Sequence, residues 1–197
     1  TSNGSAIKET SPAITINDTS TTPAFEEVIL YRVNAGGPLL TAIDSGPDWD
    51  SDLGSSASQY NNSSLAGNNA YSVSVSNITT GLISNPAHVP IDIYASQRYD
   101  ASATVEMEWD FPVANGTYTV NLFFSEVYFS SAGIRFFDVS INDEKVLTEL
   151  DKIVVGGGKY TPVFYSYSRV ITDGSIRILL EHVAGGDNPD IRLFKVV

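Results

Sequence analysis

The chain of 197 residues has no cysteine and few basic residues, with 11 lysines and arginines against 23 aspartates and glutamates. The lack of cysteine excludes disulfides, thiolate zinc sites and thiol nucleophiles. The formal net charge of −12 argues against nucleic-acid binding, because phosphate backbones are held by clustered lysine and arginine. No apolar run is long enough to span a bilayer, so we expect no membrane insertion.

What the chain does contain is typical of a folded domain, with 42% hydrophobic and 17% charged residues. Residues 1–25 are rich in serine and threonine and predict a linker or N-terminal arm. Residues 26–197 predict one domain, joined to other domains of a parent chain. We expect that parent protein to be secreted or displayed at the cell surface.

Apolar and polar residues alternate in several short segments, which is typical of half-buried strands. The clearest is residues 104–111, where Val105, Met107, Trp109 and Phe111 form one apolar face. Asn115-Gly116 then predicts a tight hairpin turn. Further strands are predicted at 28–34, 71–75, 117–124, 134–141, 145–150, 163–171, 176–183 and 191–197. With no helical period, the sequence predicts an all-β protein, an antiparallel β-sandwich of jelly-roll type.

Two aromatic rings, Tyr128 and Phe129, follow the strand at 117–124, whose alternating residues already supply a buried face. We therefore predict that these rings face a ligand. A sugar offers an apolar ring face and a rim of hydroxyls, so its site needs flat aromatic side chains beside carboxylates or amides. The candidate residues for such a site are Tyr71, Tyr99, Tyr128, Phe129, Asp187 and Asn188.

Three carboxylates, Asp48, Asp50 and Asp52, occupy alternate positions in a polar segment and resemble the start of a calcium loop. The match is partial, because Leu53 and Gln59 stand where an EF-hand needs glycine and a bidentate glutamate. A structural calcium ion at these residues and an acidic, solvated loop anchored by Trp49 are the two readings. No other cofactor is expected.

Catalytic patterns are weak. The two histidines, His88 and His182, lie in no serine elbow or metal-binding pair, and we expect both at the surface. Glu106 and Glu108 fall on the solvent face of their strand. Glu126, near the aromatic pair, is expected to be supported by Arg98 or Arg135 rather than to act as an acid.

Six short motifs, taken in order, resemble the malectin family of carbohydrate-binding domains. They are Val33-Asn-Ala-Gly-Gly37, Gln97-Arg-Tyr99, Asn115-Gly-Thr-Tyr118, Phe124-Ser-Glu-Val-Tyr-Phe129, Phe136-Phe-Asp-Val139 and Asp187-Asn-Pro189.

The resemblance implies a β-sandwich lectin, similar in fold to galactose-binding domains, that binds glucose-containing oligosaccharides without cleaving them. It assigns ligand contacts to Tyr99, Tyr128, Phe129 and Asp187, and to Tyr71, for which Tyr60 is a competitor. Gln97 departs from the glutamate usual in the family.

The sequence thus predicts a non-catalytic carbohydrate-binding module whose partner is an oligosaccharide or polysaccharide. Two alternatives remain: a β-sandwich that serves adhesion or spacing through protein contacts, and a glycoside hydrolase.

Overall fold

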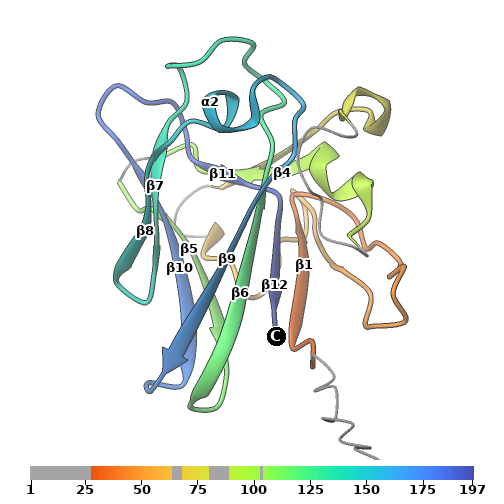
Figure 1. Cartoon of the computed structure of the whole chain (residues 1–197), viewed down its shortest axis with the longest axis vertical. Coiled ribbons are helices and arrows are strands. Elements are labelled where there is room, and N and C mark those ends of the chain that lie inside the picture. The colour runs from red at the N-terminus through yellow and green to blue at the C-terminus, as the bar shows by residue number, and fades with distance from the viewer. Residues whose placement is uncertain (1–27, 64–67, 80–88, 103) are drawn as a thin grey trace, which may run out of the picture.

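A computed structural model describes residues 28–63, 68–79, 89–102 and 104–197 (Figure 1). The predicted arm at 1–25 and His88 lie outside these ranges. Within them the chain is built from strands, with short helical turns between some of them.

The larger sheet has the strand order β2-β1-β12-β6-β9. All of its pairs are antiparallel except β1 with β2, which is parallel. Its strands are β1 (Tyr31–Ala35), β2 (Asp50–Asp52), β6 (Gly116–Phe124), β9 (Val163–Ile171) and β12 (Leu193–Val196).

The second sheet is antiparallel throughout, in the order β5-β10-β7-β8. Its strands are β5 (Met107–Pro112), β7 (Phe137–Ile141), β8 (Glu144–Leu150) and β10 (Ser175–His182). Figure 1 shows the two sheets facing each other, with β6 and β9 in front of β5 and β10. The predicted antiparallel β-sandwich is confirmed.

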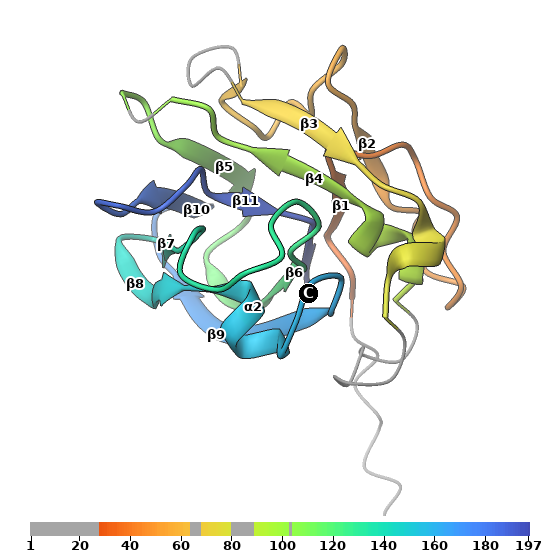
Figure 2. The same cartoon turned by 90° about the horizontal axis from the view of Figure 1, so that it is seen from above.

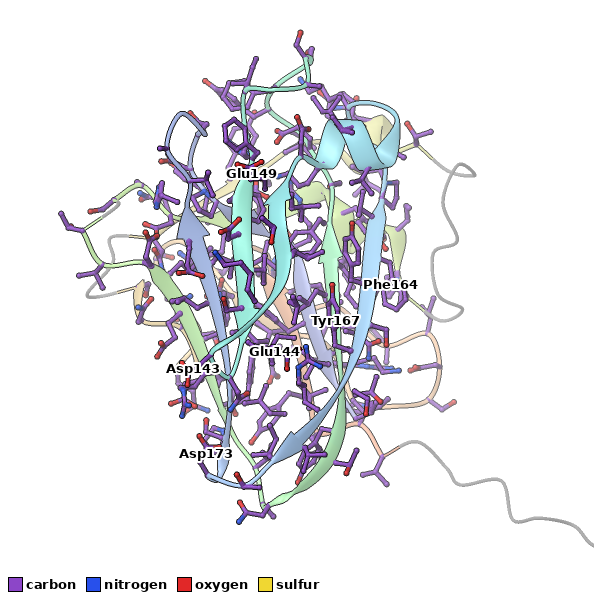
Figure 3. All side chains as sticks on the ribbon, turned by 60° about the vertical axis from the view of Figure 1, so that its left-hand side comes forward. Asp143, Glu144, Glu149, Phe164, Tyr167 and Asp173 are labelled. Atoms are coloured by element: carbon purple, nitrogen blue, oxygen red, sulfur yellow. The ribbon has the colours of Figure 1, made fainter. Side chains whose placement is uncertain are left out.

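The main core lies between these sheets because alternate residues of each strand point inward. Trp109, Phe111 and Phe194 are fully buried there, and the rings of Trp109 and Phe194 lie 4.6 Å apart. Figure 3 shows the side chains that fill the sandwich, with Tyr167 of β9 among those labelled. At the lower end, labelled Asp143 and Asp173 mark two hairpin turns.

A third, small sheet, in the order β11-β4-β3, lies at the other end of the sandwich (Figure 2). Its strands are β3 (Asn69–Ser72), β4 (Ser96–Tyr99) and β11 (Asp190–Ile191). The 3₁₀ turns η1 (Val75–Asn77) and η2 (Ile91–Ala95) flank it. A second core beneath η2 buries Trp49, Tyr94 and Phe123, so the predicted anchoring of the acidic loop by Trp49 is confirmed.

Some local predictions were wrong at their edges. Val105 is 42% exposed, because β5 begins only at Met107. The strand predicted at 71–75 ends at Ser72 and gives way to η1. The short helix α2 (Lys152–Gly156) was not predicted; Asp151 caps it by accepting from the backbone N–H groups of Ile153 and Val154.

Candidate functional site

A cleft of about 250 Å³ opens where the small sheet meets two loops, residues 125–136 and 183–189. It is lined by Tyr71, Gln97, Tyr99, Tyr128, Phe129, Arg135, Asp187 and Asn188. All six residues predicted from the sequence therefore lie in one cleft. Figure 2, viewed from above, shows the loop between β6 and β7 beside β11.

The floor of the cleft is the small sheet, whose register explains which side chains reach it. Tyr71 of β3 pairs with Gln97 of β4, and Tyr99 is two residues further along β4. Because side chains alternate across a strand, Tyr71, Gln97 and Tyr99 share one face, and Arg98 points to the other. The sheet thus places two rings and an amide in the cleft.

The aromatic wall comes from the loop after β6. Glu126 holds this loop, since its Oε1 accepts from the backbone N–H of Tyr128 at 2.7 Å and of Phe129 at 3.1 Å. The ring of Tyr128 lies edge-on to that of Phe129 at 4.9 Å and to that of Tyr71 at 5.9 Å. Tyr128 remains 58% exposed although its backbone is fixed, which agrees with the prediction that this ring is surplus to the core.

Phe129 is only half-buried, and it lies under a cation. The guanidinium carbon of Arg135 is 5.0 Å from the centre of the Phe129 ring, a cation–π contact. Phe129 therefore contributes both to the cleft wall and to the packing of the loop.

Arg135 joins the loop at 125–136 to the loop at 183–189 and to β11. Its guanidinium pairs with Glu126 at 3.3 Å, with Asp187 at 3.2 Å, and closely with Asp190. Burial opposes the charge of Arg135, but these carboxylates outweigh it and raise the pKa of the guanidinium. The prediction that Glu126 is supported by an arginine is confirmed for Arg135 and wrong for Arg98.

A buried lysine completes the network of ion pairs around Glu126 and Asp190. Lys152 of α2 is fully buried and pairs with Asp190 and with Glu126. Burial lowers the pKa of Lys152 to about 8, and the two carboxylates limit the fall. Neither Glu126 nor Asp190 is free for chemistry, since each is enclosed by cations.

The last wall is the loop before β11. The backbone N–H of Asp187 donates to the carbonyl of Ile134 at 2.9 Å, which ties the two loops together. Gly186 is required here, because a Cβ on it would lie 2.3 Å from the carbonyl oxygen of Phe136. The Asp187 side chain is 38% exposed and so presents a carboxylate edge to the cleft.

Gln97 and Arg135 line the cleft but were not predicted as contact residues. Gln97 is 2% exposed, and its Oε1 has no hydrogen-bond partner among the described residues. Alternation with Tyr99 on the same strand was the available signal for Gln97. The contribution of Arg135 was visible only as a partner for Glu126.

Arg98 is fully buried and binds Asp52 through Nε and Nη2, at 2.8 and 2.7 Å. Two other expectations need correction. Tyr60 is no competitor for Tyr71, because it packs against Phe111 in the main core. Glu106 does not point freely to solvent, as its Oε2 lies 2.7 Å from Nδ1 of the half-buried His182.

Among the described residues, the three aspartates of the predicted calcium loop do not form a group of converging ligand atoms. Asp52 is fully buried, where it binds Arg98 and accepts from the backbone N–H groups of Gly36 and Ser58. Asp48 accepts from the backbone N–H of Ala42. The guanidinium of Arg98 thus neutralises Asp52, one of the three carboxylates proposed to bind calcium. Calcium binding at Asp48, Asp50 and Asp52 stays a prediction.

Comparison with known proteins supports one family. A family model described as the malectin domain matches residues 29–191. The receptor-like protein kinase THESEUS 1 of Arabidopsis thaliana is 29% identical over 158 residues, which are 78% of this chain and 18% of that protein.

Solved structures share the fold. The extracellular domain of ANXUR2 from Arabidopsis thaliana superposes with a TM-score of 0.73 at 19% identity, covering 85% of this chain and 48% of that one. A structure of the plant peptide RALF23 in complex with FER and LLG2 matches equally, with a TM-score of 0.73, 19% identity, and 85% and 48% coverage.

This chain spans about half the length of the matched ectodomains. No helix within the described residues is long and apolar enough to cross a membrane. The prediction of a secreted or cell-surface module agrees with these relatives, since THESEUS 1 is a receptor-like protein kinase and the ANXUR2 structure is that of an extracellular domain.

Proposed function

Because the chain belongs to the malectin domain family, we propose that it is a non-catalytic module whose cleft binds a neutral oligosaccharide. Tyr71, Tyr99 and Tyr128 stack on pyranose rings, and Phe129 closes the wall behind them. Asp187 and Asn188 exchange hydrogen bonds with hydroxyls.

One observation carries this proposal: aromatic rings and a partly exposed carboxylate line the same cleft, and the ion pairs of Arg135 and Lys152 hold the loops that carry them. The cleft of about 250 Å³ is smaller than the roughly 300–1,000 Å³ of pockets that enclose a drug-sized ligand. It therefore holds only part of an oligosaccharide, and the remainder extends over the surface. Binding by a single module is expected to be weak and to gain from multivalency.

Peptide or protein binding is the second candidate. It is supported by the solved complex in which FER is bound with the peptide RALF23 and LLG2. The exposed ring of Tyr128 would also serve a protein partner, since tyrosine is enriched at interfaces.

Glycoside hydrolysis is less well supported than either. A hydrolase needs two available carboxyl groups beside the bond that is cut. Asp187 lines the cleft and is partly exposed, but Glu126 does not line it, is 1% exposed and is bound by Arg135 and Lys152.

The test is a glycan array followed by calorimetric titration with the best neutral oligosaccharide, using wild type, Tyr128→Ala and Tyr128→Phe. We expect Tyr128→Ala to weaken binding at least tenfold with little change in melting temperature, because the ring is 58% exposed. Tyr128→Phe keeps the ring and should retain most of the affinity.

Binding that Tyr128→Ala leaves unchanged would overturn the proposed site. An array with no neutral glycan bound, together with a defined peptide ligand, would favour the second candidate. Release of reducing sugar would favour a hydrolase.

A further inference from the structure

Three potential metal ligands lie close together, on residues that the proposed function does not use. They are Asp100, just after β4; Glu106, just before β5; and His182, at the end of β10. One ligand atom from each lies within 4.8 Å of the other two. Antiparallel pairing of β10 with β5, where Leu180 faces Met107, brings Glu106 and His182 together.

Asp100 is the anomaly in this group. Its side chain is fully buried; Oδ1 accepts from the backbone N–H of Ser102 at 2.9 Å, but Oδ2 has no hydrogen-bond partner among the described residues. A buried carboxylate oxygen without a partner is costly.

The other buried acids of the described ranges are each neutralised. Asp52 pairs with Arg98, Asp138 with Lys145, and both Glu126 and Asp190 with Lys152. No lysine or arginine pairs with Asp100 within those ranges. Burial raises the pKa of Asp100, and backbone hydrogen bonding and the nearby His182 offset this rise only in part.

We propose that Asp100, Glu106 and His182 bind a divalent transition-metal ion, for which zinc is the best match. Two carboxylates and one imidazole form a three-ligand set that zinc accepts, with a fourth position left for water. Calcium fits less well, because it requires six to eight oxygen ligands. Bonds of about 2 Å place zinc ligands at most about 4.2 Å apart, so small side-chain rotations suffice to close the site.

The second ring nitrogen of His182 links this site to the cleft. Nδ1 faces Glu106, while Nε2 lies 3.3 Å from Oδ1 of Asn188, which lines the cleft. A metal on Nδ1 leaves the proton on Nε2, which then donates to Asn188 Oδ1. The ion thereby fixes the Asn188 amide, with its NH₂ group available for other hydrogen bonds.

The experiment titrates the chelator-treated full chain with zinc chloride by calorimetry, with calcium and magnesium chloride in parallel. We expect one zinc per chain and no comparable binding of calcium or magnesium. Asp100→Asn, Glu106→Gln and His182→Gln should each weaken zinc binding at least tenfold. Glu108→Gln, two residues after Glu106 and within β5, and His88→Gln, at the only other histidine, are matched controls that should bind zinc as wild type does.

Melting temperatures separate a lost site from a lost fold. Zinc should raise the melting temperature of wild type, since it binds only the folded chain, and should not raise that of Asp100→Asn. Without zinc, Asp100→Asn should melt no lower than wild type, because an unpaired buried charge has been removed.

A side-chain amide NMR signal of Asn188 that shifts with one equivalent of zinc would support the link to the cleft. The metal site is overturned if zinc fails to saturate at one equivalent, or if the folded His182→Gln variant binds it as tightly as wild type. Neither outcome depends on whether the cleft binds a sugar.

Discussion

At the scale of single residues, Gln97 offers a ligand a hydrogen-bond acceptor that has no protein partner among the described residues. Its Oε1 is buried and lacks a partner among the described residues, yet it lines the cleft beside Tyr71 and Tyr99. An unpaired acceptor lowers the stability of the free protein and favours a ligand that brings a hydroxyl donor. A glutamate at this position would place a second negative charge near Asp187, whereas the amide suits a neutral ligand.

We predict that Gln97→Leu weakens oligosaccharide binding about three- to tenfold, the equivalent of one net hydrogen bond. Its free energy of unfolding should be unchanged or higher, because the unpaired acceptor is gone. Calorimetric titration and urea unfolding measure the two effects. Gln59→Leu, an exposed glutamine outside the cleft, is the control; an equal loss of affinity in that variant, or none in Gln97→Leu, would contradict the prediction.

Several contact residues were predictable one at a time, and others were not. Tyr99, Tyr128, Phe129 and Asp187 follow from motif position, and all line the cleft. The partner of Glu126 did not follow, because Arg98 and Arg135 are equivalent in sequence terms. Only strand alternation on β4, which turns Arg98 toward Asp52, leaves Arg135 as the partner.

At the scale of elements, the junction after β1 supports the floor of the cleft. Gly36 has φ of +73° and lies against β4, so that a Cβ would be 1.8 Å from the carbonyl oxygen of Gln97. The sequence Gly36-Gly37-Pro38 permits a close approach of backbone, but it does not indicate which strand is approached. It is the strand that carries Gln97 and Tyr99.

We predict that Gly36→Ala abolishes folding or lowers the melting temperature by more than about 10 °C, because backbone atoms cannot move aside as a side chain can. Gly133→Ala is the control, since Gly133 has a similar φ of +78° but nothing within 4 Å of its Cβ position. It should cost only about 1 kcal/mol, the strain of the left-handed conformation. Thermal melting of both variants tests this, and equal losses would show that φ rather than contact decides.

An ion pair between Arg32 and Asp44 holds the loop between β1 and β2. We expect its contribution to the free energy of unfolding to be lost in acid. The hydrogen bond from Arg32, with its charge, lowers the pKa of Asp44 to about 2. The guanidinium of Arg32 also lies 4.5 Å from the ring of Trp49. A carboxyl group with a lowered pKa stabilises the fold above its unfolded pKa, and this stabilisation is lost as the pH falls toward the folded value.

We therefore expect Asp44→Asn to be less stable than wild type at pH 7, with the difference shrinking between about pH 4 and pH 2. Urea unfolding at pH 7, 4 and 2.5 measures it. Wild type will still lose stability in acid, because Asp138 and Asp190 also have lowered pKa values. A constant difference at all three pH values would contradict the assignment.

At the scale of the whole molecule, the net charge of −12 separates the two candidate ligands. A neutral oligosaccharide is held by stacking and short hydrogen bonds, which salt screens little. A basic peptide would be drawn by the long-range field of the acidic surface, which salt screens strongly.

We predict that oligosaccharide affinity changes less than about twofold between 50 and 500 mM sodium chloride. Binding of a basic peptide at the same cleft should weaken about tenfold or more over that range. Titrations at both salt concentrations distinguish the cases. A strong salt dependence of the glycan affinity would mean that charge, and not stacking, governs binding.

The sequence by itself determined the fold class, because alternation and turn residues are local properties. Residues 163–171 form a strand over the predicted span, and Met107, Trp109 and Phe111 are buried as their spacing requires. The aromatic motifs likewise indicated which rings were surplus to the core.

Only the tertiary structure decided which residues meet. Tyr99 and Asp187 are far apart in the chain, and they share a cleft because β11 pairs with β4. The same pairing buries Asp100, and strand pairing between β10 and β5 brings Glu106 to His182. Which distant residues come into contact depends on strand register and on the burial of charge. Both are set only when distant segments pack together, so neither can be read from the local sequence.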